Sequence, residues 1–383
     1  MRILIIGPRE SRGALAAARA LGSRGHYVGF GSAMRGGLVD ASRWVRRWHR
    51  LPWPQQPTFA PSLAATVEDQ RYAMVFAAGD DWLAALAESR DRLSACVPYS
   101  STESLHMSMD KLALGALATE AGMRAPHTVE ATPETLASWE GRAIVKAGSH
   151  WLPHAPHSSL RLEAELVADR HEAALRAQVI RSHGAQPLLQ EVFDGDLVAV
   201  TTLTDASARP IARLQQRALG VWPVPAGVST RAITVPIDPE LATGLDGLLA
   251  RLQWFGLAQA QFIVRGDQKV LVDLNARYYG SMALAAAAGL NLPALWVSVA
   301  HGERIATTPS AALGARYAWL EGDLRRAAHE RRGGLVQDLA DSVAWASHAG
   351  HSISDFRDPL PALRHSAHLT ARAMSKVGRR VVR

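Results

Sequence analysis

Over the first hundred residues, short apolar runs alternate with helical segments, and this alternation constrains the fold more than any other feature. An apolar run at residues 3–6 precedes an alanine-rich stretch at residues 11–21, and similar runs follow at residues 27–30 and 73–77. Strands that are apolar on both faces fit the interior of a parallel sheet covered by helices. Residues 1–105 are therefore predicted to form a doubly wound α/β domain.

The first turn of this domain argues against a dinucleotide site. Gly7 and Gly13 do not have the spacing of the dinucleotide fingerprint, and no acidic residue ends the second predicted strand. Asp80 and Asp81 follow the third predicted strand. We expect one of them to cap the next helix, and contact with a cationic substrate group is the alternative.

Composition places the chain among ordinary globular proteins, because 48% of its residues are apolar and 20% are charged. The single cysteine, Cys96, excludes an internal disulfide framework and is typical of a reducing cytosol, so a cytoplasmic protein is expected. Glycine, asparagine and proline interrupt the apolar stretch at residues 282–300. Two buried helices explain this stretch better than a membrane span.

The formal net charge is +7, and much of it lies near the C-terminus. We expect a solvated face of a terminal helix there, and no nucleic-acid partner. A second basic cluster at residues 43–50 interleaves tryptophans with arginines. Coverage of a domain edge and stacking on bases are both open for this cluster. The C-terminal basic residues are Arg364, Arg372, Lys376, Arg379, Arg380 and Arg383.

From residue 110 onward the pattern changes to that of an α+β protein. A helix over residues 110–121 ends at Gly122, and a strand over residues 143–146 ends in Lys146. Beyond residue 301 the chain is predicted to be helical. Between these parts we expect a helix over residues 163–182 and strands over residues 188–192, 198–203 and 211–214.

Two apolar runs flank Gly266 and Asp267, a pattern typical of a β-hairpin. Asp273 and Asn275 alternate along the second strand and therefore share a face. Gln261 lies opposite Asp273 if a loop of three or five residues, centred on Asp267, joins the strands. Three oxygen donors would then converge, as Mg²⁺ prefers. A polar strand that faces solvent and binds nothing is the alternative.

Two lysines and a strand end add to this candidate site. Lys111 begins a predicted helix and Lys146 ends a strand, and together they would neutralise nucleotide phosphates in a shared cleft. Taken singly, a lysine at a strand end is more often a surface residue. Gln190 and Glu191 precede a turn, and this strand end would present backbone groups and a carboxylate to an adenine and its ribose.

In this order the segments resemble the ATP-grasp superfamily, specifically its carbamoyl-phosphate-synthase-like branch and the carboxylate–amine ligases. The similarity covers residues 110–293 and rests on six weak motifs in the family's order. It implies an α/β and α+β fold with a Rossmann-like pre-ATP-grasp domain (residues 1–105) and a small lobe or lid (residues 106–190). A large lobe with the metal site (residues 191–305) and a helical, basic C-terminal extension (residues 306–383) would follow.

The resemblance also implies roles and cofactors. ATP and Mg²⁺ (or Mn²⁺) are the implied cofactors, with the nucleotide bound by Lys111, Lys146, Gln190 and Glu191. The metal would be held by Gln261, Asp273 and Asn275. Arg277 resembles a phosphate-binding arginine, and Arg217 or Arg231 is the candidate for stabilising a tetrahedral oxyanion.

The implied reaction is ATP-dependent ligation, in which a carboxylate becomes an acyl-phosphate and an amine then displaces phosphate. The partners are thus a small carboxylate and an amine, with a homodimer left open as the assembly. The sequence departs from the family pattern at three places, and two of them, Asp273 and the poor lid, favour an alternative: a non-catalytic ATP-binding module that docks an acidic partner through its basic tail. Asp273 replaces the usual glutamate, Ala147 replaces a proline, and residues 148–154 form a poor version of the glycine-rich lid.

Overall fold

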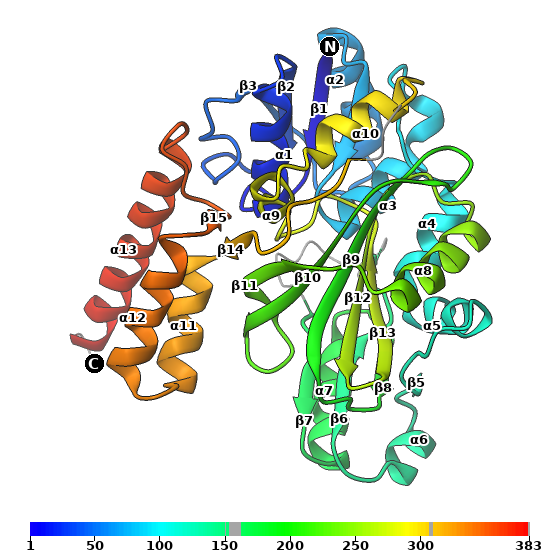
Figure 1. Ribbon diagram of the computed structural model, residues 1–383, viewed down its shortest axis with the longest axis vertical. Helices are drawn as coiled ribbons and strands as arrows, with labels where there is room; N and C mark the ends of the chain where they lie inside the picture. The colour runs from blue at the N-terminus through cyan, green and yellow to red at the C-terminus, as the bar shows by residue number, and fades with distance from the viewer. Residues whose placement is uncertain (150, 153–161, 306–308, 382–383) are drawn as a thin grey trace.

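The computed structural model describes residues 1–149, 151–152, 162–305 and 309–381 (Figure 1). Its N-terminal domain is built on a four-stranded parallel sheet in the order β3-β2-β1-β4, as the alternating pattern predicts. The basic cluster at residues 43–50 supplies the edge strand β3, which the sequence did not reveal as a strand. The strands are β1 (Arg2–Ile6), β2 (Tyr27–Ser32), β3 (Val45–Arg50) and β4 (Met74–Ala77).

Helices cover both faces of this sheet, and their starts follow ordinary capping chemistry. Ser11 caps the first helix by accepting a hydrogen bond from the backbone of Ala14, at 3.1 Å. The side chains of β1 from Ile3 to Ile6 are fully buried between the helix layers. The helices are α1 (Arg12–Gly22), α2 (Phe59–Gln70), α3 (Asp80–Glu88), the short 3₁₀ helix η1 (Arg90–Arg92) and α4 (Thr102–Met109).

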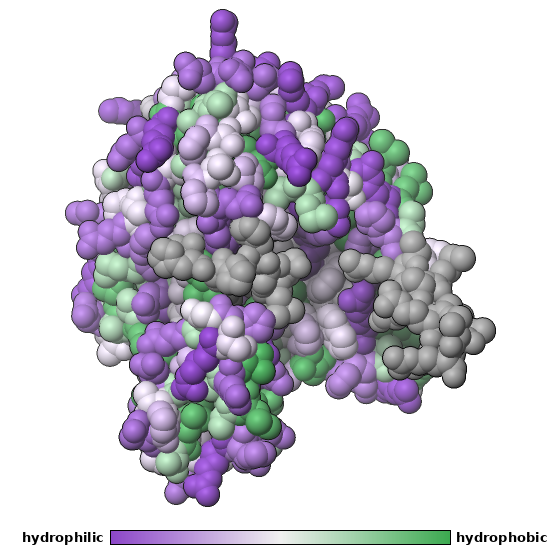
Figure 2. All heavy atoms as spheres, turned by 180° about the vertical axis from the view of Figure 1, so that it is seen from behind, coloured by the Kyte–Doolittle hydropathy of each residue, from purple (hydrophilic) through white to green (hydrophobic). Residues whose placement is uncertain are grey.

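A second sheet of four strands forms a small lobe that projects from the rest of the molecule (Figures 1 and 2). Its strands pair antiparallel in the order β5-β8-β6-β7. The helix predicted over residues 163–182 begins only at Arg170, because Asp169 caps it and a strand precedes it. The lobe comprises β5 (Thr128–Glu130), α6 (Pro133–Ser138), β6 (Ala143–Ala147), β7 (Glu165–Val167), α7 (Arg170–Ser182) and β8 (Pro187–Gln190).

Helix α5 (Lys111–Glu120) leads into this lobe and matches the predicted helix within one residue. Asp110 caps it by accepting hydrogen bonds from the backbone of Leu112 and Ala113. Gly122 follows with a φ of 77°, a conformation that favours glycine after a helix end. The cap fixes the position of Lys111, the first residue of the helix.

The third sheet has seven strands in the order β13-β12-β9-β10-β11-β14-β15. Helix α8 (Pro239–Arg251) covers one of its faces, where Arg213 forms an ion pair with Asp246. Its last two strands come from the C-terminal extension, so the expectation that this extension is wholly helical is wrong. The strands are β9 (Asp196–Thr204), β10 (Pro210–Trp222), β11 (Val228–Val235), β12 (Gly256–Arg265), β13 (Gln268–Asn275), β14 (Arg316–Ala318) and β15 (Gly350–His351).

The apolar stretch at residues 282–300 forms two helices, α9 (Ala283–Ala287) and α10 (Leu292–Ala300), as predicted. Asn291 caps the second of them by accepting a hydrogen bond from Ala294 at 3.0 Å. Within the part of the chain that the structure describes, no helix has the length and apolar character needed to cross a bilayer.

Buried ion pairs attach the C-terminal extension, which contains α11 (Leu320–Glu330), α12 (Leu335–Ala346) and α13 (Leu360–Val381). Within the extension the fully buried guanidinium of Arg326 donates to Asp323 at 2.8 Å and to Asp338 at 2.7 Å. Asp323 also accepts from Arg231 of the large sheet, at 2.5 Å. Asp358, also fully buried, accepts from Arg19 of the N-terminal domain at 2.9 Å. Since breaking a buried pair leaves an uncompensated charge, the extension is an integral part of the fold.

The loop that follows β13 is packed on the N-terminal domain at the carboxyl ends of its parallel strands. The backbone N–H of Tyr278 donates to the carbonyl of Ala77, at 3.3 Å. A Cβ placed on Gly13 would lie 2.7 Å from the carbonyl oxygens of Tyr278 and Tyr279. The crevice in which open α/β sheets bind ligands is therefore filled here by the protein's own backbone.

Candidate functional site

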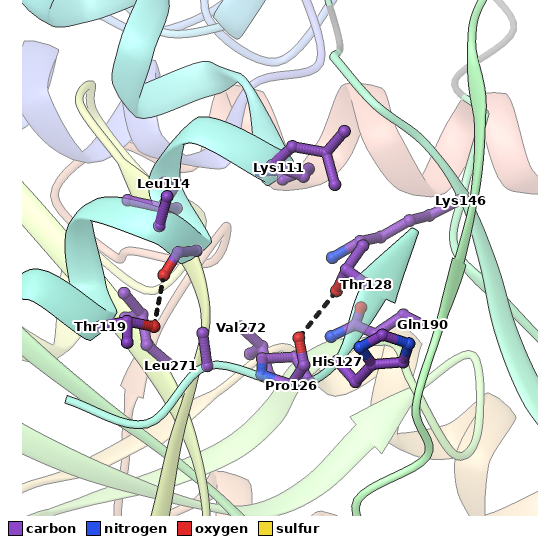
Figure 3. Close-up of a pocket in the computed structure, with 14 residues that line it drawn as sticks. Lys111, Leu114, Thr119, Pro126, His127, Thr128, Lys146, Gln190, Leu271 and Val272 are labelled. Carbon is purple, nitrogen blue, oxygen red and sulfur yellow. Dashed lines mark hydrogen bonds between the residues drawn. The ribbon is translucent and has the colours of Figure 1, made fainter. Parts of the chain in front are cut away.

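A cleft of about 450 Å³ is lined by residues of both the small lobe and the large sheet. An adjoining cavity of about 270 Å³ is lined by Lys111, His127, Lys146 and Gln190 among others (Figure 3). Segments that are far apart in sequence therefore meet at one place. Of the predicted site residues, the cleft gathers Lys111, Lys146, Gln190, Glu191, Gln261 and Asp273.

The pairing of β12 with β13 confirms the predicted register of the metal site. Gln261 lies directly opposite Asp273, and Gln259 lies opposite Asn275. All four residues share one face of the sheet, because paired residues in a sheet point the same way. Gln261 and Asp273 both line the cleft, whereas Asn275 shares their face of the sheet but is not among the residues that line it.

The hairpin reaches this register by a different route from the one expected. Its loop has only two residues, since Arg265 pairs with Gln268. Gly266 has a φ of 58°, as the first loop position of a type II′ turn requires. A β-bulge next to Gln261 then shifts the register by one residue and restores the opposition with Asp273. The expectation of a three- or five-residue loop is wrong.

An ion pair joins the two halves of the site. The ammonium of Lys111 donates to Oδ1 of Asp273, and the Lys111 side chain is only 7% exposed. The same oxygen of Asp273 accepts a hydrogen bond from the backbone of Leu274, at 2.9 Å. The one carboxylate among the three predicted metal ligands is therefore already matched by a positive charge.

Lys146 reaches the cleft because side chains alternate along β6. Its neighbour Val145 is buried in the core of the small lobe, whereas Lys146 faces the cavity (Figure 3). Burial, together with repulsion from Lys111, lowers the pKa of Lys146 to about 8, against an opposing attraction to Asp273. The site thus keeps an ammonium group in surroundings that disfavour its charge, as a phosphate-binding lysine would be kept.

The end of β8 is fixed against the strand that precedes α6. Gln190 is buried and pairs with both Thr128 and Ile144. The backbone N–H of Glu191 donates to the carbonyl of His127 at 2.9 Å, and its carboxylate accepts from the backbone of His127 at 3.3 Å. His127 lines the cavity, and we found no sequence signal that would have identified it.

The donor set fits Mg²⁺ only when nucleotide phosphates complete it. One carboxylate and two amide side chains offer oxygen atoms, the donors that Mg²⁺ prefers, and Mg²⁺ in nucleotide sites is typically held by one or two carboxylates plus phosphates. Among residues 1–149, 151–152, 162–305 and 309–381, no group of three or more histidine, cysteine, aspartate or glutamate side chains is placed to bind a metal. The site thus suits a metal ion that arrives with its nucleotide.

Arg277 is held by the N-terminal domain. Its Nε and Nη2 donate to the two carboxylate oxygens of Asp80, at 2.7 and 2.9 Å. The expectation that Asp80 or Asp81 caps α3 is wrong, because Gly79 occupies the cap position. Burial raises the pKa of Asp81 to about 6.

The structure brings none of the three predicted arginines into the lining of the cleft. Arg217 lies four residues from Arg213 on β10 and therefore on the face covered by α8, opposite to Gln261. Arg231 is engaged in the extension, where its Nε lies 2.5 Å from Asp323. Arg332, between α11 and α12, lines the cleft instead. No sequence pattern distinguishes Arg332 from the many other arginines of the C-terminal extension.

Part of the segment expected to form a lid falls outside the described residues. Residues 150, 153 and 154 are in this part. Gly148 precedes it, and its carbonyl accepts a hydrogen bond from the backbone of Lys111 at 3.0 Å. This contact ties the end of β6 to the start of α5.

No protein-family profile matches the chain, and no curated protein is similar to it in sequence. Solved structures do share its fold. An L-amino acid ligase from Bacillus licheniformis is 16% identical to this chain, with a TM-score of 0.60. The alignment covers 78% of this chain and 73% of the ligase.

Two further structures align over similar lengths. N5-carboxyaminoimidazole synthetase from Staphylococcus aureus, complexed with ADP, has a TM-score of 0.62 at 12% identity, with 82% and 80% of the two chains covered. Biotin carboxylase from Campylobacter jejuni has a TM-score of 0.61 at 13% identity, with 82% and 74% covered. At these identities the likeness establishes the shared fold alone.

Proposed function

We propose that this protein is an ATP- and Mg²⁺-dependent ligase that activates a substrate carboxylate as an acyl-phosphate and joins it to an amine. The observation that carries the proposal is the meeting of two lysines, a buried glutamine and an oxygen-donor strand in one cleft. The ATP-grasp fold and the ligase neighbours support the same reaction class.

The residues present are those that phosphoryl transfer requires. Such transfer depends mainly on positioning and on electrostatic stabilisation, so no covalent nucleophile is needed. Lys111 and Lys146 would hold the phosphate chain, while Gln190 and Glu191 would hold the adenine and ribose. Mg²⁺ would be held by Gln261, Asp273 and Asn275, and it would supply charge neutralisation at the β- and γ-phosphates.

The arginines divide into two groups under this proposal. Arg277 is assigned to the transferred phosphoryl group, since it lies two residues beyond Asn275 at the end of the metal strand. For the oxyanion formed when the amine attacks, Arg217 and Arg231 gain no support from the site geometry. Arg332 is the guanidinium that lines the cleft, and we assign it to this role in their place.

Trapping of the activated intermediate tests the proposal. The full chain is incubated with MgATP, hydroxylamine and a panel of carboxylic acids, and hydroxamate and ADP are measured. We expect one class of acid to give hydroxamate with an equal amount of ADP. Release of AMP and pyrophosphate would contradict the acyl-phosphate mechanism. MgATP binding without any acid-dependent ADP release would favour the non-catalytic module instead.

Two variants with the same chemical change test whether β13 holds the metal ion. Asp273→Asn removes the only carboxylate of the proposed metal site and should abolish ADP release. Asp267→Asn makes the same chemical change at the exposed hairpin tip, six residues earlier, and should leave it unchanged. Equal turnover by the two variants would mean that β13 does not hold the metal.

A further inference from the structure

The carboxylate of Asp80 grips the guanidinium of Arg277 along one edge. Two parallel hydrogen bonds of 2.7 and 2.9 Å join Nε and Nη2 of the arginine to the two carboxylate oxygens. Both side chains are largely buried, at 11% and 16% exposed. Bidentate pairs of this kind fix the plane of the guanidinium as well as its distance, so Arg277 has one orientation here.

The pair with Asp80 uses only part of the hydrogen-bonding capacity of the guanidinium. An arginine side chain has five N–H groups. Two of them serve Asp80, and a third donates from Nη1 to the carbonyl of Tyr278 at 3.4 Å. The remaining two can bind an anionic group without loss of the ion pair. The interaction with Asp80 is thus compatible with phosphate binding by Arg277.

Asp80 belongs to a different domain from the site that it supports. It is the first residue of α3 in the N-terminal domain and lies 197 positions before Arg277. The capping position of α3 is filled by Gly79, so the carboxylate of Asp80 is directed at the arginine instead. Close packing at Gly13 holds the backbone of the same loop against this domain.

We propose that Asp80 is a positioning residue that orients Arg277 toward the transferred phosphoryl group. The inference rests on the proposed function. Under this inference the N-terminal domain contributes to catalysis without binding a ligand, because its Asp80 holds Arg277, which follows β13. The crevice at its strand ends is filled by the loop that carries Arg277.

Nucleotide binding by the full chain tests the inference without knowledge of the substrates. Affinities for MgADP and for the Mg²⁺ complex of a non-hydrolysable ATP analogue are measured by calorimetry. Asp80→Asn retains the shape of the side chain, but its amide cannot accept both hydrogen bonds. We expect the preference for the triphosphate to fall about tenfold, the worth of one charge-assisted hydrogen bond, with little change for MgADP.

The arginine variant and the double variant give the second measurement. Arg277→Lys retains the charge but loses the bidentate geometry, so it should reduce the preference by a similar factor. Combining it with Asp80→Asn should add little, because both changes break one interaction. A merely structural ion pair would lower the thermal midpoint and leave the nucleotide preference of all three variants intact, which would overturn the proposal. If Asp80→Asn does not fold, Arg277→Lys and Asp80→Glu provide the same comparison.

The controls separate failure of this inference from failure of the proposed function. Asp69→Asn removes an exposed carboxylate on α2 of the same domain and should change neither affinity. Equal affinity of the unaltered chain for both nucleotides would overturn the role of Arg277 and hence of Asp80. If the unaltered chain binds neither nucleotide, the proposed function itself is refuted.

Discussion

Replacement of Lys146 by methionine should stabilise the nucleotide-free protein while removing nucleotide binding. Burial and repulsion from Lys111 lower the pKa of Lys146 from 10.5 to about 8. A pKa lower by about 2.5 corresponds to about 3 kcal/mol, which is the penalty for keeping this ammonium charged in the cleft at neutral pH. Methionine retains a long, flexible, apolar side chain, so most of this penalty should be recovered on substitution.

The expected gain depends on pH in a defined direction. Below pH 8 the lysine is protonated in both the folded and the unfolded state, so the full penalty applies. Between pH 8 and 10.5 the folded state releases the proton first, and the stability of the unaltered protein rises with pH. The advantage of Lys146→Met should therefore be largest near pH 7 and should vanish as the pH approaches 10.5.

Thermal midpoints of both proteins at several pH values, with and without MgATP, measure these effects. We expect the variant to melt a few degrees higher at pH 7 without nucleotide, and MgATP to raise the midpoint of the unaltered protein only. Lys269→Met is the control, because Lys269 pairs with Asp238 and Glu240 at 2.7 and 2.6 Å and has a raised pKa. That variant should lose stability. Equal or lower stability of Lys146→Met at pH 7 would refute the reasoning.

Three other predictions follow from the described contacts. Asp273→Asn should abolish ADP release. Because Lys111 loses its ion-pair partner, the variant should also have a free energy of unfolding lower by about 1–3 kcal/mol in urea titrations. Truncation after Leu363 removes the contacts of Arg364 with the buried Asp40 and of His365 with Glu321, while Asp40 keeps its hydrogen bonds from the backbone of Gly36 and Gly37, so soluble expression and ATP turnover should persist at a lower thermal midpoint. Gly13→Val should displace the loop at Tyr278 and reduce both thermal midpoint and ADP release, whereas Gly247→Ala, whose nearest contact would be 3.7 Å away, should be tolerated.

Local rules predicted those parts of the site that depend on a few neighbouring residues. The strand pattern around Asp273 placed it on the face of Asn275. The cap at Asp110 and the glycine at Gly122 fixed the helix that presents Lys111. In each case the deciding forces act within one turn or one hairpin.

Interactions between distant segments could not be predicted in this way. The bulge beside Gln261 shifts the register in a manner that the apolar pattern does not encode. Asp80 had two plausible local roles, and only its contact with Arg277 reveals a third. The face of Arg217 depends on the full length of β10, of which the sequence pattern showed only the first part.

The cluster around Arg326 restricts how this sequence can evolve. Its charges balance, and replacement of any one member would leave a partner charge uncompensated in or near the core, at a penalty of about 3–5 kcal/mol for a fully buried pair. Substitutions in this cluster are therefore tolerated only when both partners of an ion pair change together, or when the buried members are replaced by apolar residues. Homologous chains should show correlated substitution at these positions rather than independent drift. The members are Arg231, Asp323, Arg326, Glu330, Arg332 and Asp338.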